Sequence, residues 1–365
     1  LGVLNSHRRF FLPYAAPIIW SAAQIAALII GGGWLLYSGE ALARLLAFGA
    51  LAGAGLEFAA LLAAAKPWIK SLRPRFDTKN PHVREAARRL PGVIMGRGVI
   101  QISGIIDTLL VSFLGAGANA TFAYAQMLYL LPMSLLGTGE AAVSLPAMAR
   151  ETAEQDLEVQ HQRMRERLGV ILTRVIVLSV PATVALTLFG RNIIGLLLQT
   201  GAFDSKSTTR VAAALSVYGF ALLGNASVRL FATTFFALGD TRTPARFAVV
   251  RVLVSTAVAL LLMGPYGVVG VVAGATIAAW IETIILGQKL RKVIGGLGLH
   301  SLPVVRIALM AAITVAIPWA LREGLASTAI HQSLIAHLIA LTALGLTFLL
   351  SAMAVTGPAR RMSAP

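Results

Sequence analysis

The residues of this chain that could do chemistry are a few polar side chains set inside apolar runs. Asp107 interrupts the run from Val99 to Leu114, and an ionised group at that depth in hydrocarbon costs roughly 3 kcal/mol or more. Such residues usually face a bundle interior or a water-filled cavity. Asp107 either binds a cation or takes up a proton, or it is a hydrogen-bonded carboxylate that holds two helices together.

A second group is predicted near the cytoplasmic side. Arg97, Gln101 and Gly104 share one helical face at spacings of four and three, so Arg97 either contacts an anion at a cavity mouth or snorkels to headgroups. On the next apolar segment Gln126 and Glu140 also share a face. We expect an Arg97–Glu140 pair, serving either structure alone or a response to substrate.

No functional role is predicted for several other charged residues in or near the apolar runs. Arg251 and Arg306 lie near predicted helix ends and are expected to snorkel to headgroups. Glu57 and Glu282 stand within apolar runs, and the sequence indicates no partner for either.

The composition fixes the environment of these residues. Hydrophobic residues make up 57% of the 365 positions and charged residues 13%, with a mean hydropathy of +0.78, whereas soluble domains carry about 25% charged residues. The chain is predicted to be an all-α integral membrane protein. It has no cysteine, which excludes disulfides and thiolate sites, and its net charge of +16 is better explained by topology and lipid headgroups than by nucleic acid.

Apolar runs long enough to span a bilayer predict about ten helices, which lie at 12–33, 42–64, 91–114, 119–146, 169–189, 208–237, 245–264, 267–287, 302–321 and 332–355. A further apolar stretch at 190–200 is too short to count separately. Glu151 to Arg167 mixes charges and predicts a surface helix. The turn from Leu238 to Pro244 predicts a positive φ at Gly239, backbone hydrogen bonds to Asp240, and a helix start near Pro244.

Loop charge predicts the orientation. The loops on one side hold few basic residues: Arg44, Arg191, Lys206, Arg210 and Arg322. Most of the others lie in the alternate loops, chiefly the stretch 66–89 and the loops near 163–167, 242–246 and 289–292. That side, with both ends of the chain, is predicted to be cytoplasmic. The basic, proline-containing stretch 66–89 reads as a linker, either a plain connection or a regulatory one.

Several segments stand out when they are taken together: Gln101–Leu114, Ala123–Pro132 running on to Ser144–Pro146, Thr200–Phe203 and Ala237–Pro244. They resemble the MurJ (MviN) lipid II flippase family of the multidrug/oligosaccharidyl-lipid/polysaccharide exporter superfamily. Their order and spacing cover nearly the whole chain.

The resemblance implies a two-lobe, fourteen-helix fold, of which this chain would lack the first four helices. Residues 1–65 would end the N-terminal lobe and residues 66–90 would form the basic cytoplasmic linker. Residues 91–290 would make the C-terminal six-helix lobe, and residues 291–365 two additional helices and a tail.

The resemblance further implies a multi-pass flippase of the bacterial cytoplasmic membrane. Its substrate would be lipid II, the undecaprenyl-pyrophosphate-linked peptidoglycan precursor, carried across by alternating access. It implies a cavity position for Arg229 and an acidic family position for Asp107. Family members have Asp-Arg where this chain has Gln126-Met127, so either Arg97 supplies the cation or the cargo differs. Ala259 replaces a residue that is often polar in relatives, so no metal site is expected.

Three hypotheses therefore stand. The first is lipid II flipping, with the bilayer and cell-wall synthesis proteins as further partners. The second is a transporter of the same superfamily for another polyprenyl-linked glycan or a small cation, and the third a non-transporting scaffold. No P-loop, zinc spacing or nucleophile motif occurs, so neither an enzyme nor a cofactor is expected.

Overall fold

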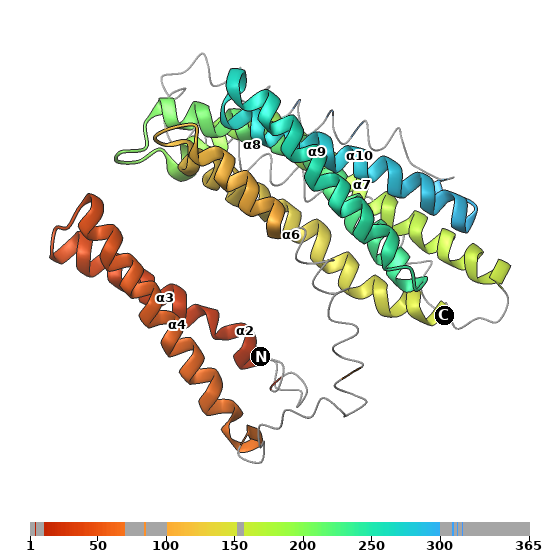
Figure 1. The fold of residues 1–365 in the computed structure, drawn as a ribbon, viewed down its shortest axis with the longest axis horizontal. Helices are drawn as coiled ribbons and strands as arrows, with labels where there is room; N and C mark the ends of the chain where they lie inside the picture. Colours follow the sequence, from red (N-terminus) through yellow and green to blue (C-terminus); the bar gives the residue numbers. More distant parts are fainter. Residues whose placement is uncertain are drawn as a thin grey trace. The chain divides into compact units, whose positions relative to one another are not determined.

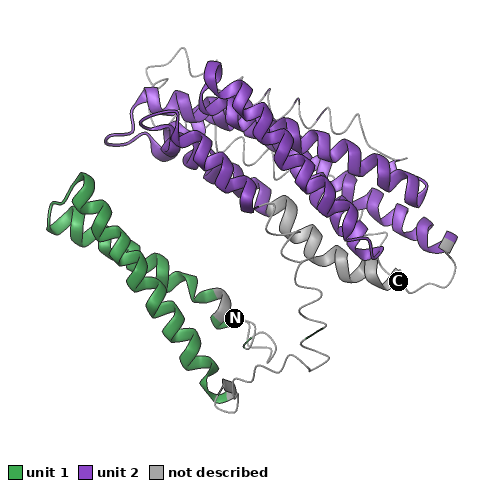
Figure 2. Ribbon diagram, viewed as in Figure 1, with its two compact units in different colours: residues 1–84 green, residues 85–365 purple. Residues whose placement is uncertain are grey.

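The computed structural model describes residues 4, 11–69, 84, 101–151, 157–299, 309, 312 and 316, without the side chains of 13, 14, 68, 69 and 135–157. The described elements are helical (Figure 1). The chain divides into two compact units, residues 1–84 and residues 85–365 (Figure 2).

Unit 1 is a helical hairpin. Its elements are α2 (Phe11–Ala15), α3 (Pro17–Leu28), the π-helical turn η1 (Ile29–Trp34) and α4 (Gly39–Ile69). A Cβ added to Gly53 of α4 would lie 3.0 Å from the carbonyl oxygen of Trp20 on α3, so the two backbones nearly touch. The Trp20 indole N–H donates to the carbonyl oxygen of Ala50 at 3.1 Å, so a hydrogen bond also joins α3 to α4 near this contact.

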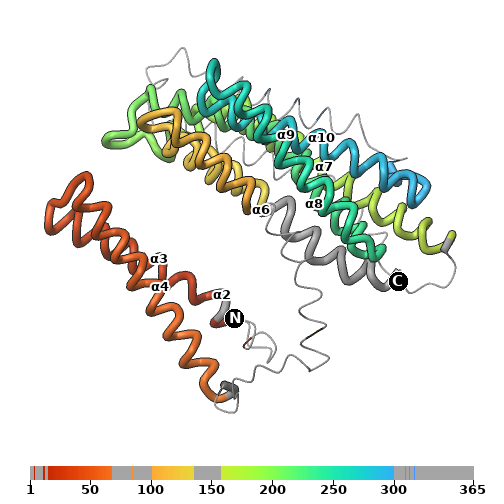
Figure 3. The backbone as a smooth tube through the Cα atoms, in the orientation of Figure 1, coloured from red at the N-terminus to blue at the C-terminus, as the bar shows by residue number. Residues whose placement is uncertain are grey.

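Unit 2 consists of long helices running side by side (Figure 3). Its elements are the helix Gln101–Ser112, α6 (Ala118–Glu151), α7 (Leu157–Leu198), α8 (Ser205–Ala237), α9 (Arg242–Tyr266) and α10 (Val268–Ile294). The central helix is α8, which packs against α6, α7 and α10, while α9 packs chiefly on α10.

Helix α7 differs from the predicted bounds. The span was predicted at 169–189, the mixed-charge stretch Glu151–Arg167 was expected to be a surface helix, and residues 190–200 were not counted as a separate span. Instead one continuous helix of 42 residues begins at Leu157 and runs through Pro181 to Leu198. No residue between the charged first turns and the apolar part of α7 forces the backbone out of helical geometry. The boundary between charged and apolar sequence is therefore not the end of a helix. Similarly, α4 extends past Pro67 to Ile69.

The turn between α8 and α9 confirms its sequence prediction. Gly239 has φ +80, and Asp240 Oδ1 accepts from the backbone N–H groups of Arg242 at 3.0 Å and Thr243 at 2.9 Å. Partial burial disfavours the charged form of this carboxylate, but the hydrogen bonds outweigh it and hold the pKa of Asp240 below its usual value. Pro244 lies in the first turn of α9.

Six of the described helices are long and apolar enough to cross a membrane: Pro17–Trp34, Gly39–Pro67, Glu158–Leu198, Ser205–Ala237, Arg242–Tyr266 and Val268–Ile294. Each falls on a predicted span. The chain is therefore a multi-pass membrane protein. The predicted spans at 302–321 and 332–355 lie outside the described residues, apart from Leu309, Ala312 and Ala316.

Candidate functional site: a polar cluster inside unit 2

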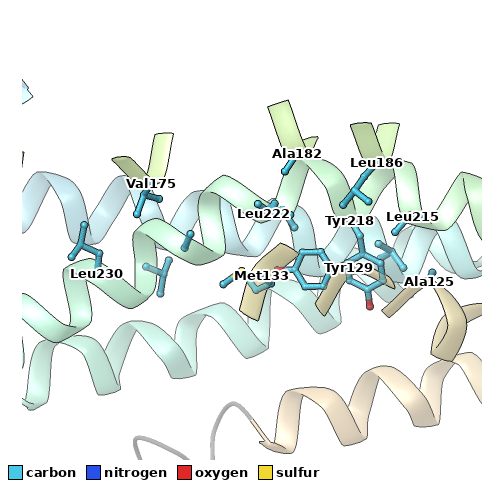
Figure 4. Packing of buried hydrophobic residues seen from close by; sticks show 14 of the residues in the cluster. Ala125, Tyr129, Met133, Val175, Ala182, Leu186, Leu215, Tyr218, Leu222 and Leu230 are labelled. Atoms are coloured by element: carbon cyan, nitrogen blue, oxygen red, sulfur yellow. The ribbon is translucent and has the colours of Figure 1, made fainter. Parts of the chain in front are cut away.

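Two tyrosines form the centre of a polar cluster between α6 and α8. Tyr129 and Tyr218 are both 6% exposed, and their rings stack with centroids 4.9 Å apart (Figure 4). Asn225 lies two turns beyond Tyr218 on the same face of α8 and donates from Nδ2 to the Tyr129 hydroxyl at 2.8 Å. Figure 4 shows the tyrosines among Leu215, Leu222 and Met133, so this hydrogen bond satisfies polar groups within an apolar core.

Asp107 faces the same interior. Asp107 is 8% exposed, and the neighbouring Leu110 and Val111 belong to the core of unit 2. Asp107 Oδ1 is buried and accepts no hydrogen bond from the described residues. This burial matches what the sequence predicts for a carboxylate in an apolar run, while ion or proton coupling stays a prediction.

Arg251 and Glu282 correct the sequence predictions made for them. Arg251 does not snorkel away from the bundle: its Nη1 lies 3.2 Å from Glu282 Oε2, and the two side chains are 25% and 5% exposed. Glu282 thus has a partner. The physical reason is the length of the hairpin.

Helices α9 and α10 are joined at Gly267. Arg251 precedes this turn by nearly the same number of residues as Glu282 follows it. Both therefore lie about 23 Å from the turn at 1.5 Å per residue. The sequence does contain a signal for this pair: Arg251 and Glu282 are nearly equally far from Gly267 along the chain.

The predicted substrate-contacting residues do not form one joined site among the described residues. Gln101 is exposed and Gln126 is half-buried on α6, three residues before Tyr129. Arg229 is exposed on α8, one turn past Asn225. Within the described part of unit 2, no hydrogen bond links Gln101, Gln126 and Arg229 side chains to one another.

The predicted Arg97–Glu140 pair is not tested. Arg97 lies outside the described residues, and only the backbone of Glu140 is described, as part of α6.

Comparison with known proteins places the chain. The family described as "Lipid II flippase MurJ" matches residues 1–345. The chain belongs to the MurJ family.

Curated MurJ relatives include the probable lipid II flippase MurJ of Rhizobium meliloti, which is 31% identical over 78% of this chain and 52% of the relative. The lipid II flippase MurJ of Burkholderia cenocepacia is 28% identical over 80% of this chain and 56% of the relative. The chain thus spans about half the length of the curated relatives it matches.

A solved lipid II flippase MurJ in an inward closed conformation shares the fold. It aligns with a TM-score of 0.75 and 20% identity over 97% of this chain and 69% of the solved one. The family resemblance inferred from the sequence segments is confirmed.

The position at which the family resemblance implies an arginine carries an exposed methionine. Met127 is 57% exposed on α6, and a thioether offers no positive charge to a diphosphate. Among the described residues, no group of three or more His, Cys, Asp or Glu side chains is arranged to hold a metal ion. The chemistry available in the described cluster is charge pairing and hydrogen bonding, the kind a transporter uses to bind or hold polar groups within a membrane.

Proposed function

We propose that this MurJ-family protein moves lipid II across the bacterial cytoplasmic membrane by alternating access. The observation that carries the proposal is the family match over residues 1–345, and the fold match to a solved MurJ supports it. A diphosphate and sugars do not cross hydrocarbon unaided because desolvating them is too costly. A polar cavity between lobes replaces water around them, while the lipid tail stays in the bilayer.

The architecture in this proposal is a fourteen-helix, two-lobe fold to which the chain contributes about ten helices. Residues 1–65 belong to the N-terminal lobe, 66–90 to the linker, 91–290 to the C-terminal lobe and 291–365 to two further helices and a tail. The division into compact units near residue 84 and the 69% coverage of the solved chain support this division. The excess of basic residues in alternate loops supports cytoplasmic placement of both ends.

Substrate contacts are proposed for Arg97, Gln101, Gln126, Glu140 and Arg229. The exposed side chain of Arg229 within unit 2 supports its inclusion, because a cation must be accessible to meet a diphosphate. Asp107 is proposed to take part in ion or proton coupling, which its burial among helices supports. Cell-wall synthesis proteins are proposed partners.

A second candidate is transport of a different polyprenyl-linked glycan. The exposed Met127 supports it, since the family resemblance implies a cation at this position. Under this alternative the chain keeps the fold and the alternating cycle but not the affinity for lipid II.

The test is rescue of a bacterium depleted of its own MurJ by the protein expressed from its complete gene. We expect growth, together with lipid II that becomes accessible to an externally added probe. Arg97→Ala and Arg229→Ala should each reduce this externalisation at least tenfold at equal membrane abundance. Arg210→Ala is the matched control, because Arg210 is also an exposed arginine of α8 but has no proposed contact.

Two results would change the conclusion. Correct insertion without externalised lipid II would reject lipid II as the cargo. If Met127→Arg then created the activity, the altered family position would explain the difference in cargo.

A further inference from the structure

Exposed basic side chains gather at the open end of the α9–α10 hairpin, away from its turn. They are Arg242 and Arg246 in the first two turns of α9, and Lys289, Arg291 and Lys292 in the last two turns of α10. We call these five residues the basic end of the hairpin. Within the described part of unit 2, no ion pair holds any of their side chains.

Two pairs of these residues lie at matching heights on the facing helices. Counting outward from Gly267, Arg246 and Lys289 both lie about 32 Å from the turn at 1.5 Å per residue. Arg242 and Lys292 both lie about 37 Å from it on the same count. Positive charge is therefore stacked in two layers across the hairpin.

The length of the hairpin brings this end to the level of lipid headgroups. The hydrocarbon core of a bilayer is about 30 Å thick. Tyr266, beside the turn and 63% exposed, is of the residue type that is enriched at membrane–water interfaces. With the turn at one interface, the basic end lies among the phosphate groups of the opposite one. Lys289 Nζ lies 5.5 Å from the centroid of the Phe247 ring, so α9 and α10 are in contact at this height.

Exposed apolar side chains continue from the basic end toward the middle of α9. Val250 and Leu253 follow Arg246 at spacings of four and seven, and they therefore share its face. They are 39% and 65% exposed. On α10, Ile284 lies two turns before Arg291 and is 53% exposed. A charged layer at headgroup height thus adjoins an apolar surface at the height of acyl chains.

The carboxylates of the hairpin do not neutralise the basic end. Helix α9 contains none, and the single carboxylate of α10, Glu282, pairs with Arg251. Asp240 precedes α9, and its Oδ1 accepts from the backbone N–H groups of Arg242 at 3.0 Å and Thr243 at 2.9 Å. An excess of positive charge remains, which an anion from outside the chain can compensate.

We propose that the basic end of the α9–α10 hairpin binds an anionic phospholipid of the surrounding leaflet. Arg246 and Lys289 hold its phosphate through charge-assisted hydrogen bonds, and an acyl chain lies along Val250 and Leu253. Clusters of four to eight basic residues beside a membrane span are typical of anionic-lipid binding. An acidic protein segment would match the charge but would leave the adjoining apolar face unused.

The inference goes beyond the proposed function because the ligand is a lipid of the bilayer and not the transported cargo. A phospholipid bound here joins the ends of α9 and α10 to the membrane interface. The binding does not depend on which cargo the protein moves.

The experiment titrates the protein, expressed from its complete gene and purified in nonionic detergent, with phosphatidylglycerol or with phosphatidylcholine of the same acyl chains. Native mass spectrometry counts the bound lipids. We expect wild type to bind phosphatidylglycerol at least tenfold more tightly. Each basic residue near an anionic headgroup contributes about fivefold in affinity, so combining Arg246→Gln, Lys289→Gln and Lys292→Gln should abolish this preference. Inorganic phosphate at the same concentration should not compete, because it has no acyl chain.

The matched control combines Arg191→Gln, Lys206→Gln and Arg210→Gln. These three residues are also exposed, and they lie near the turn between α7 and α8, at the other end of the helices. Removing the same amount of charge there should leave the preference for phosphatidylglycerol unchanged. An equal loss in the two triple variants would overturn the proposal, because net charge alone would then explain the binding.

Two further results would also overturn it. One is a wild-type protein that binds the two lipids equally. The other is binding of a polyglutamate peptide, but not of phosphatidylglycerol, that depends on the basic end. If the triple variant does not fold, Arg246→Gln alone still decides, since exposed substitutions are usually tolerated. It should lower the affinity for phosphatidylglycerol about fivefold, and an unchanged affinity would reject the site.

Discussion

Two helical hairpins of this protein share a mode of packing but differ in what they do with a carboxylate. In α3–α4, Gly53 meets the backbone of Trp20, and in α9–α10 a Cβ on Gly274 would lie 2.6 Å from the carbonyl oxygen of Ser255. Small residues let the backbones approach in both hairpins. Yet Glu282 is buried and paired, whereas Glu57 of α4 is half-buried and, among described residues, has no ion-pair partner.

The difference follows from what stands opposite each carboxylate. Counting outward from the Gly267 turn brings Arg251 level with Glu282. Counting outward from the α3–α4 turn brings the apolar start of α3, Pro17 and Ile18, roughly level with Glu57. Close packing through small residues is therefore general to the two hairpins, while a buried charge becomes a structural contact only where the facing helix supplies a cation at the same height.

The largest expected effect comes from breaking the buried pair. Arg251→Leu leaves Glu282 buried without compensation and should lower the unfolding free energy by about 3–5 kcal/mol. Replacing both residues by leucine should recover most of that loss, because no uncompensated charge remains. Reversible unfolding in mixed detergent micelles measures both.

The matched control is Arg44→Leu. Arg44 pairs with Glu40 at 2.6 Å, but the side chains are 73% and 79% exposed, and such pairs contribute at most about 1 kcal/mol. Equal losses for Arg251→Leu and Arg44→Leu would contradict the distinction between buried and exposed pairs.

The second expected effect concerns the glycine contacts that the hairpins share. Gly274→Ala pushes a methyl group into the backbone of α9 at Ser255 and Ala259, and should cost about 1–3 kcal/mol through forced separation of the helices. Gly264→Ala is the control, since nothing lies within 4 Å of a Cβ there. Thermal melting of the two variants distinguishes a packing effect from a change in helix propensity.

Much of this fold can be predicted from the sequence, because the membrane leaves few alternatives. The apolar runs 245–264 and 267–287 predict the helices α9 and α10. Gly239 and Asp240 predict the turn between α8 and α9. The length of α7 could not be predicted from hydropathy, because helical hydrogen bonding continues across a change of polarity.

Of the candidate site, Asp107 could be found because a lone carboxylate stands out in an apolar run. Tyr129 and Tyr218 could not, since aromatic residues in apolar helices are common and only packing of α6 on α8 brings these two together. The prediction that Arg251 snorkels to headgroups was wrong. It considered only the distance of Arg251 from its helix end and not that Glu282 lies at the same level on the facing helix.

The third expected effect separates polar contacts from charge pairs. Tyr129→Phe removes the acceptor for Asn225 Nδ2 and should cost about 1–3 kcal/mol, because the buried amide loses its partner. Tyr124→Phe removes a hydroxyl from a 37% exposed tyrosine on the same helix and should be nearly neutral. A Tyr129→Phe variant as stable as wild type would mean that the Asn225 amide finds another acceptor.

The smallest expected effect tests the other side of the comparison. Glu57→Gln in α4 keeps the size of the side chain and removes a charge that has no ion-pair partner among the described residues, so the unfolding free energy should change by no more than about 0.5 kcal/mol. Glu282→Gln, the same substitution in α10, leaves the Arg251 guanidinium without its counter-charge and should be clearly destabilising. If Glu57→Gln proved as costly as Glu282→Gln, then Glu57 would have a cationic partner of its own, and the two hairpins would differ in the place of their ion pair and not in its presence.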